Sequence, residues 1–299
     1  MNTDPRIAPQ VRPPFAPQIS QLSGNRLHLH HGPIDLILWA DAPPDQTASA
    51  YHAAITRFDG LLAELVAELP ALRRPDPGPL HGPIARAMAR AVAPHHPAFI
   101  TPMAAVAGAV ADAILSAMTE HATLRRAYVN NGGDIALHLT QGQSLTAAIA
   151  RPGSLADRVT ITHADPVRGL ATSGWRGRSF SLGIADAVTV LAATAAAADA
   201  AATMIANAVN LPGHPAIGRC PANSLQADTD LGTIPVTTKV GALTAGDIAQ
   251  ALSQGEAKAR TLLDRRVIAG AALFLHPESR CLGHLALAVT PSAKELSLV

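Results

Sequence analysis

Aromatic residues are scarce in this sequence of 299 residues: they make up 3% of it, whereas hydrophobic residues make up 48%. A core with so few large rings must be built mainly from Ala, Val, Leu and Ile. Helices that carry such small side chains can pack closely together. The chain is long enough for one large domain or two modest ones.

An excess of charge of one sign is also lacking, because 23 Lys and Arg residues stand against 22 Asp and Glu residues, a net charge of +1. Proteins that hold a nucleic-acid backbone usually present a strongly basic surface. The composition therefore argues against nucleic acid as a partner.

Cysteine is nearly absent. Cys220 and Cys281 are too few for a disulfide framework and are not spaced like zinc ligands, which favours a reducing compartment. The N-terminus is rich in proline and has no continuous apolar segment of the kind that a signal peptide needs. We therefore expect a flexible proline-rich leader over residues 1–22, a single domain over residues 23–299, and a cytoplasmic location.

A long apolar run free of polar groups is missing too. The most apolar region, residues 184–211, contains Asp186, Asp199 and Asn207, and a carboxylate in lipid is costly. We expect no membrane span, and we interpret residues 184–210 as a buried alanine-rich helix.

The patterns that are present predict alternating strands and helices. A hairpin is expected over residues 25–40; helices are expected over residues 46–72, 84–92, 99–118 and 244–254, and strands over residues 159–162, 168–173, 234–240 and 271–275. In the third of these helices Thr101 is a candidate cap, with Pro102 at the first helical position.

Five polar residues flanked by two β-type runs form the central motif: Asn130, Asn131, Gly132, Gly133 and Asp134. Adjacent glycines allow positive φ and let another molecule approach the backbone amides, so the motif could cradle an anion. The same residues make ordinary hairpin turns. From this stretch alone both interpretations stay open.

Two further segments carry polar groups in suggestive positions. The loop over residues 171–183 contains Arg176 and Arg178, which could bind a phosphate or carboxylate, although a surface loop would look the same. Asp199, Thr203 and Asn207 recur every four residues and so share one helix face, where their oxygens would suit Mg²⁺ or form an internal hydrogen-bond ladder.

Several polar residues are left without an assigned role. Asp112 is the only charge on an apolar helix and must be paired, hydrogen-bonded, protonated or metal-bound. His28, His30 and His31 could belong to a metal site, but a solvated strand face is the favoured interpretation, and His214 and His276 cannot be assigned. Neither a Ser-His-Asp set, a phosphate-binding P-loop nor a dinucleotide-binding glycine fingerprint stands in usable context.

Four motifs in order resemble the ApbE superfamily: Gly108-Ala-Val-Ala111, Tyr128-Val-Asn-Asn-Gly-Gly-Asp134, Ala171-Thr-Ser-Gly174 and Asp199-x-x-x-Thr203. The resemblance implies an α+β, T-fold-related architecture of antiparallel sheets packed against alanine-rich helices. ApbE proteins are Mg²⁺-dependent transferases that bind FAD and move FMN onto a Thr or Ser of a partner protein.

The resemblance also assigns roles to residues. It implies a flavin nucleotide bordered by the cofactor-binding residues, a metal held by Asp199 and Thr203 with a carbonyl near Ala109–Ala111, and Asp134 and Asp199 as catalytic groups. The candidate cofactor-binding residues are Asn130, Asn131, Gly132, Gly133, Thr172, Ser173, Gly174, Arg176 and Arg178.

The chain departs from the transferases over residues 178–190, where their His-x-x-Asp-Pro segment is missing. It is therefore most similar to the shorter ApbE-like proteins that lack this loop. We expect a cytoplasmic enzyme that binds a flavin nucleotide or another anionic small molecule with Mg²⁺. The alternatives are a non-catalytic flavin-binding or accessory protein, for example in sulfur assimilation, and a hydrolase of a non-flavin molecule; a homo-oligomer is an open option.

Overall fold

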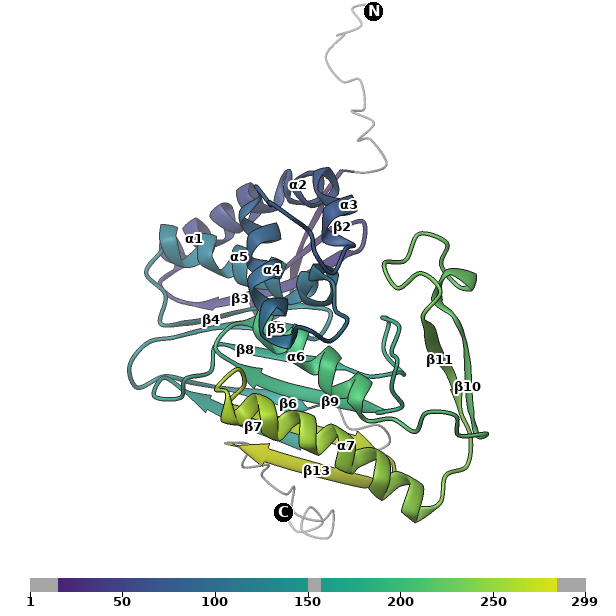
Figure 1. The fold of residues 1–299 in the computed structure, drawn as a ribbon. Helices are drawn as coiled ribbons and strands as arrows, with labels where there is room; N and C mark the ends of the chain where they lie inside the picture. The colour runs from purple at the N-terminus through teal and green to yellow at the C-terminus, as the bar shows by residue number, and fades with distance from the viewer. Residues whose placement is uncertain (1–15, 150–156, 284–299) are drawn as a thin grey trace, which may run out of the picture.

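One antiparallel sheet of nine strands organises the computed structural model, which describes residues 16–149 and 157–283 (Figure 1). The strand order in space is β1-β2-β3-β4-β5-β8-β9-β12-β13. The strands are β1 (Gln18–Leu22), β2 (Arg26–His31), β3 (Ile34–Asp41), β4 (Arg126–Asn131), β5 (Asp134–Leu139), β8 (Gly169–Ser173), β9 (Ala187–Ala192), β12 (Gly270–Leu275) and β13 (Glu278–Gly283).

Helices cover one face of this sheet, which confirms the expected α+β class. They are α1 (Pro44–Phe58), α2 (Leu61–Ala67), α3 (Leu69–Leu72), α4 (Pro83–Val92) and α5 (Val106–His121), then α6 (Ala195–Ala208) and α7 (Ala245–Asp264), with short 3-10 turns η1 (Ala93–His95), η2 (Pro102–Ala105) and η3 (Ala222–Ser224). Alanine and glycine on α5 and α6 let these two central helices lie close to each other.

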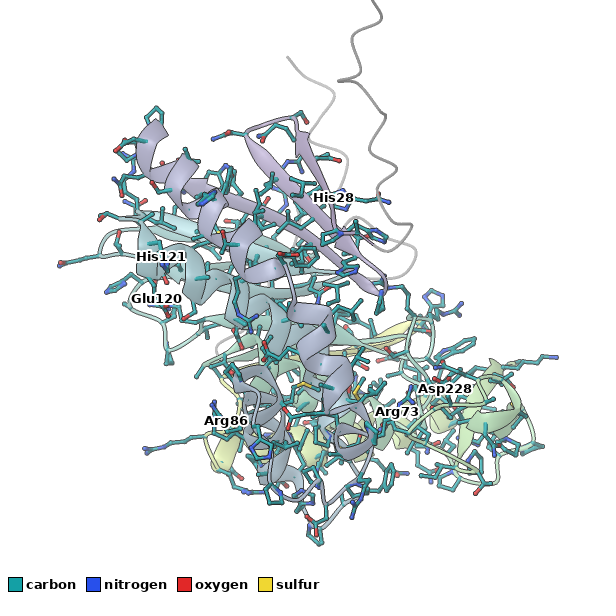
Figure 2. All side chains as sticks on the ribbon, turned by 90° about the horizontal axis from the view of Figure 1, so that it is seen from above. His28, Arg73, Arg86, Glu120, His121 and Asp228 are labelled. Atoms are coloured by element: carbon teal, nitrogen blue, oxygen red, sulfur yellow. The ribbon has the colours of Figure 1, made fainter. Side chains whose placement is uncertain are left out.

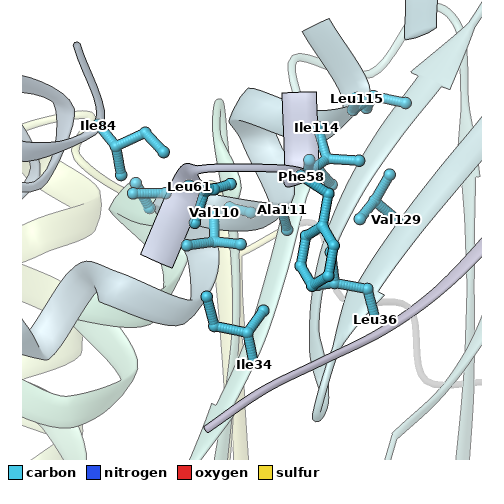
Figure 3. Close-up of a cluster of buried hydrophobic side chains, with 14 of the residues drawn as sticks. Ile34, Leu36, Phe58, Leu61, Ile84, Val110, Ala111, Ile114, Leu115 and Val129 are labelled. Carbon is cyan, nitrogen blue, oxygen red and sulfur yellow. The ribbon is translucent and has the colours of Figure 1, made fainter. Parts of the chain in front are cut away.

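The order of elements divides the sheet into two halves with the same plan. Each half consists of a hairpin, two long helices and a second hairpin: β2-β3, α1, α5 and β4-β5 in the first, and β8-β9, α6, α7 and β12-β13 in the second. Each half has its own helix-to-sheet core. In the first, Phe58 of α1 lies near Leu36 of β3 and Ile114 of α5 (Figure 3).

Two additional hairpins complete the described structure. The hairpin of β6 (Ser144–Ile149) and β7 (Asp157–Thr162) covers part of the sheet face opposite the helices, where Ile149 and Ile161 pack with Leu137, Leu170 and Phe274. The hairpin of β10 (Ile217–Pro221) and β11 (Pro235–Val240) extends beside the body of the molecule (Figure 1). Arg73 holds it through an ion pair with Asp228 at 2.8 Å (Figure 2).

The region predicted as one long helix, residues 184–210, is the largest difference from expectation. Residues Ala187–Ala192 form strand β9 and only Ala195–Ala208 form a helix. All six residues of β9 are buried: Val188 and Val190 pack with the helices, and Ala187 and Leu191 pack in the cluster on the opposite face, under the β6–β7 hairpin. A strand buried on both faces lacks the alternation of polar and apolar residues, so its sequence cannot be told from a buried helix by periodicity.

Smaller differences concern element ends. Part of the predicted leader, Gln18–Leu22, is edge strand β1, while residues 1–15 lie outside the described residues. The helix predicted over residues 46–72 breaks at Gly60, which has φ +79°, and the helix predicted at 244–254 continues to Asp264. Thr101 does not cap its helix; its hydroxyl bonds to Asp230 instead.

One helical stretch in the described residues, Pro102–His121, is long and apolar enough to cross a membrane by length and composition. In the apolar 18-residue segment of this stretch, 56% is buried inside the protein. Helix α5 is in contact with α1, α6, β4 and β5, which is the environment of a core helix.

Candidate functional site

A cavity of about 710 Å³ opens where the β4–β5 turn meets α6. Protein sites for small molecules commonly have volumes of about 300–1,000 Å³. Except for Arg176, the residues predicted to form the site all line this cavity: Asn130, Asn131, Gly132, Gly133, Asp134, Thr172, Ser173, Gly174, Arg178, Asp199 and Thr203. The structure thus brings together residues as far apart in the chain as Asn130 and Thr203, 73 positions from each other.

The glycine turn is both a hairpin turn and part of the cavity wall. Gly132 and Gly133 have φ values of +63° and +118°, and the side-chain oxygen of Asn130 accepts a hydrogen bond from the Gly133 amide at 2.8 Å. A Cβ atom on Gly132 would lie 1.8 Å from a terminal nitrogen of Arg178. The guanidinium of Arg178 therefore rests directly on the turn, and only glycine leaves it that space.

Asn131 connects the turn to the start of α5. Its side-chain nitrogen donates to the carbonyl oxygen of Ala107 at 3.1 Å, and its side-chain oxygen accepts from the amide of Asp35 at 3.5 Å. The side chain is buried, with 6% exposure. Asn131 thus fixes β4 against α5 and β3 as well as lining the cavity.

Two half-buried carboxylates, Asp134 of β5 and Asp199 of α6, face the same cavity. Burial raises the pKa of Asp134 to about 7, although a hydrogen bond from the Thr172 amide at 3.3 Å and the charge of Arg178 oppose the shift. Burial and the charge of Asp134 also raise the pKa of Asp199 well above its ordinary value. Two carboxylates in this situation stabilise a shared proton or a bound cation.

Asp199 and Asp112 form a reciprocal arrangement between α5 and α6. The carboxylate of Asp112 accepts hydrogen bonds from the amides of Ala195 and Ala196, at 3.0 and 2.9 Å, at the N-terminus of α6. The carboxylate of Asp199 accepts one from the amide of Gly108, at 3.0 Å, in the first turn of α5. Each helix therefore caps the other, because amides in a first helical turn lack partners within their own helix.

The two capping carboxylates, Asp112 and Asp199, differ in whether they also line the cavity. Asp112 uses both oxygens on α6, and burial raises its pKa in spite of these bonds. Asp199 caps α5 and also lines the cavity. Of the roles considered for Asp112, the structure shows the hydrogen-bonded one.

The residues at the carboxylates fit a hard cation. Asp199 and Thr203 lie one turn apart on α6 and both line the cavity, and Mg²⁺ in proteins usually binds one or two carboxylates with other oxygens. Ala107 of α5 lines the cavity beside them, whereas Ala109 and Ala111 are buried in the core. No group of three or more His, Cys, Asp or Glu side chains within reach of one metal ion occurs among the described residues.

Asn207, the third polar residue on the predicted stripe, has a different role. Its side-chain oxygen accepts hydrogen bonds from the Leu182 amide at 2.9 Å and the Ser181 hydroxyl at 3.3 Å. These bonds hold the segment that follows the Arg178 loop against α6. The stripe therefore divides into two cavity residues and one that anchors the backbone.

Arg176 and Trp175 are directed away from the cavity, to Asp186. The carboxylate of Asp186 accepts from Nε of Arg176 at 2.6 Å, from Nε1 of Trp175 at 3.3 Å and from the His276 amide at 2.8 Å. The Arg176 guanidinium also lies over the Trp175 ring, 4.8 Å from its centre. The loop is thereby anchored on one side and presents Arg178 on the other.

Asp186 was missed by sequence reasoning, although a signal existed. Like Asp112, it is a lone carboxylate in an apolar region, with a side chain only 5% exposed. Such a group needs several partners. The sequence shows the need but not which distant segments supply the partners.

Within residues 16–149 and 157–283, the histidines do not form a metal site with one another. His28 contacts Asp35 at 2.6 Å, the His31 ring packs on Phe58, and His214 lies 3.5 Å from Asp247. Strand and loop positions with local partners account for these three.

Fold and site together define an α+β protein with a carboxylate-lined cavity between the two halves of its sheet. A family model described as "AbpE bacteria" matches residues 19–286, so the chain belongs to this family. This agrees with the ApbE-like family expected from the motifs. Its place among the shorter ApbE-like proteins that lack the His-x-x-Asp-Pro loop stays a prediction.

Curated relatives of the chain are UPF0280 proteins. The one from Methanopyrus kandleri is 38% identical over 125 residues, which cover 42% of this chain and 48% of the relative. Those from Methanothermobacter thermautotrophicus and Archaeoglobus fulgidus are 40% and 42% identical, over 45% and 37% of this chain and 50% and 45% of the relatives. The matches thus cover about half the length of these relatives.

Proposed function

We propose that the chain is a cytoplasmic ApbE-like enzyme that binds a flavin nucleotide together with Mg²⁺ in the cavity. The observation that carries this proposal is the convergence of Asp134 and Asp199 beside a glycine turn covered by Arg178. Half-buried carboxylates next to an arginine suit a cation and a phosphate in the same place.

Each group has a role in this proposal. Asp199 and Thr203 hold the cation, which neutralises phosphate charge and favours phosphoryl transfer when it is bound. Arg178 and the amides of Gly132 and Gly133 bind phosphate oxygens. Asp134, with a pKa near 7, is suited to accept a proton from an attacking hydroxyl.

The melting temperature of the purified chain tests the proposal. FAD with Mg²⁺ should raise it, because a ligand that binds only the folded state stabilises that state. Asp199→Asn should remove most of this shift. Asp264→Asn, at an exposed position on α7, is the matched control and should keep it. A chain that FAD does not stabilise, with or without Mg²⁺, would contradict the proposal.

A non-catalytic flavin-binding protein is the second candidate, and the segment after Arg178 favours it. A Cβ atom on Gly183 would lie 2.0 Å from the carbonyl oxygen of Ala206, so this segment runs tightly against α6 where the transferases carry a histidine loop. Incubation with FAD, Mg²⁺ and a Thr- or Ser-containing acceptor separates the two candidates. Release of AMP supports the enzyme, whereas binding without release supports the accessory protein.

A further inference from the structure

The cavity has a second compartment on the sheet face opposite the helices. Ile37, Tyr128 and Leu137 line it from three neighbouring strands, and Leu145 of β6 lies among the residues that line it. Neighbouring residues of a strand face opposite sides of a sheet. Asn131 faces α5, and Tyr128 belongs to the hydrophobic cluster under the β6–β7 hairpin. This compartment is apolar, unlike the end that holds Asp134, Asp199 and Arg178.

Tyr128 is held in a fixed orientation. Its ring stacks on Trp39, with centres 5.9 Å apart and planes inclined by 25°, and Arg126 lies over the Trp39 ring at 5.5 Å. Aromatic rings favour offset stacking with further flat groups. A flat apolar group in the compartment would therefore find a rigid aromatic wall.

Arg26 lines the cavity on the same face of the sheet. It lines the cavity from β2, at the end of the β1–β2 turn, where Nε and one terminal nitrogen donate to the carbonyl and hydroxyl oxygens of Ser23 at 2.9 and 3.3 Å. A guanidinium has five N–H donors, so donors are left for a ligand. The turn fixes the direction in which they point.

The two arginines stand at opposite ends of the cavity. Arg26 is two strands away from β4, a separation of about 10 Å, and Gly132 lies four residues beyond Tyr128, about 13 Å along the strand direction. The backbones of Arg26 and Gly132 are therefore about 16 Å apart, and a ligand that reaches both ends of the cavity must be elongated. A phosphate or a single small ring is too short for this.

We propose that Arg26 is a specificity-determining residue for a ligand with two unlike ends. One end is anionic and lies at Arg178 and the glycine turn; the other is a flat aromatic ring system that stacks on Tyr128 and presents hydrogen-bond acceptors at its outer edge to Arg26. This inference rests on the proposed function and extends it, since it gives the ring end to Tyr128, which had no assigned role, and to Arg26, which lies outside the four motifs.

Three probes separate the two ends in calorimetric titrations of the full chain with Mg²⁺ present: FAD has both ends, riboflavin has only the ring end, and ADP has the phosphate end without the flavin ring. Arg26→Met should weaken the binding of FAD and of riboflavin by about tenfold or more, because a lost hydrogen bond to a charged group has this effect, and should leave the affinity for ADP unchanged. Arg178→Met should weaken the binding of FAD and of ADP and leave the affinity for riboflavin unchanged. Arg90→Met, at an exposed position on α4, is the matched control.

The outcomes distinguish this inference from the proposed function. FAD that binds the wild type and Arg26→Met equally would overturn the inference and leave the proposed function standing. Failure of all three probes to bind would overturn both. Circular dichroism checks that Arg26→Met folds; if it does not, Arg26→Lys carries the test, with a smaller loss for FAD and riboflavin expected because lysine keeps the charge and loses the planar fork.

Discussion

Gly132 meets two demands at once: a left-handed backbone and an empty space for Arg178. Alanine at this position would cost about 1 kcal/mol in backbone strain. Its Cβ would also displace the flexible Arg178 side chain from the turn. In the proposed function, Gly132 therefore serves ligand binding as well as the hairpin turn.

We predict that Gly132→Ala lowers the free energy of unfolding by about 1–2 kcal/mol and weakens FAD binding by about tenfold or more. Gly142→Ala is a matched control, because Gly142 has φ +78° and a Cβ atom added there would have nothing within 4 Å. Its stability should fall equally while its affinity stays unchanged. Denaturant titration and calorimetry measure the two effects; equal affinities for both variants would contradict the role of the turn.

Asp186 shows how burial decides the value of an ion pair. Its carboxylate is 5% exposed and joins Arg176, Trp175 and the His276 amide, whereas Asp228, paired with Arg73 at 2.8 Å, is 67% exposed. Exposed pairs contribute about 0–1 kcal/mol. Removing a buried acceptor leaves its donors without partners.

We predict that Asp186→Ala lowers the free energy of unfolding by about 2–4 kcal/mol, and Asp228→Ala by less than about 1 kcal/mol. Asp186→Ala should also shift the fluorescence of Trp175 toward longer wavelengths in a Trp39→Phe background, because the indole is released from Asp186 and becomes more exposed to water. Similar losses of stability in the two variants would show that Asp186 does not anchor the loop.

At the scale of elements, the crossing of α5 and α6 determines the geometry of the cavity. A Cβ atom on Gly108 would lie 2.3 Å from the carbonyl oxygen of Ala195, a backbone atom that cannot move alone. The helices would have to separate, and with them the reciprocal caps of Asp112 and Asp199. The position of Asp199 in the cavity depends on this contact.

Gly108→Ala should therefore lower the free energy of unfolding by about 2–4 kcal/mol, although alanine is the better helix former. Gly246→Ala on α7, where the nearest atom to a new Cβ is the Thr244 hydroxyl at 3.7 Å, should instead stabilise by about 0.5–1 kcal/mol. Chemical denaturation measures both. If Gly108→Ala left the free energy of unfolding unchanged, the two helices could separate without a loss of stability.

The sequence predicts those parts of the site that lie within one element. Asp199 and Thr203 are recognisable from helical spacing, and the glycine turn from its residue types.

The parts that depend on other elements are not predicted. The residues of strand β9 are typical of a helix as well, because burial on both faces hides the strand period. The sequence assigns no role in the site to Arg26 or Tyr128, because their place at the cavity depends on which strands are neighbours, and strand order is a property of the whole sheet.

At the scale of the whole molecule, His95 lies in η1, which follows α4, near the positive charges of Lys258, Arg265 and His96. It is buried, and neither ring nitrogen has a hydrogen-bond partner among the described residues. Burial, with these charges adding to it, lowers the pKa of His95 to about 4. The unfolded chain therefore binds a proton at this residue at a higher pH than the folded chain does.

We predict that stability is lost as the pH falls from about 6.5 to about 4, by up to about 3 kcal/mol, because the unfolded state takes up the proton first. His95→Leu should remove this slope. His52→Leu, at an exposed position on α1, should keep it. Urea titrations at several pH values measure the effect, and an unchanged slope in His95→Leu would assign it to other groups.

The two halves of the sheet meet at β5 and β8, where two residue pairs are in register, Ile135↔Leu170 and Ala136↔Gly169, against six between β4 and β5. The cavity lies at this junction, and its lining comes from both halves. A bound molecule would contact both halves and so strengthen the junction between them. If the two outer strands were pulled apart, we expect the sheet to separate first between β5 and β8, and an occupied cavity to raise the force needed for this separation.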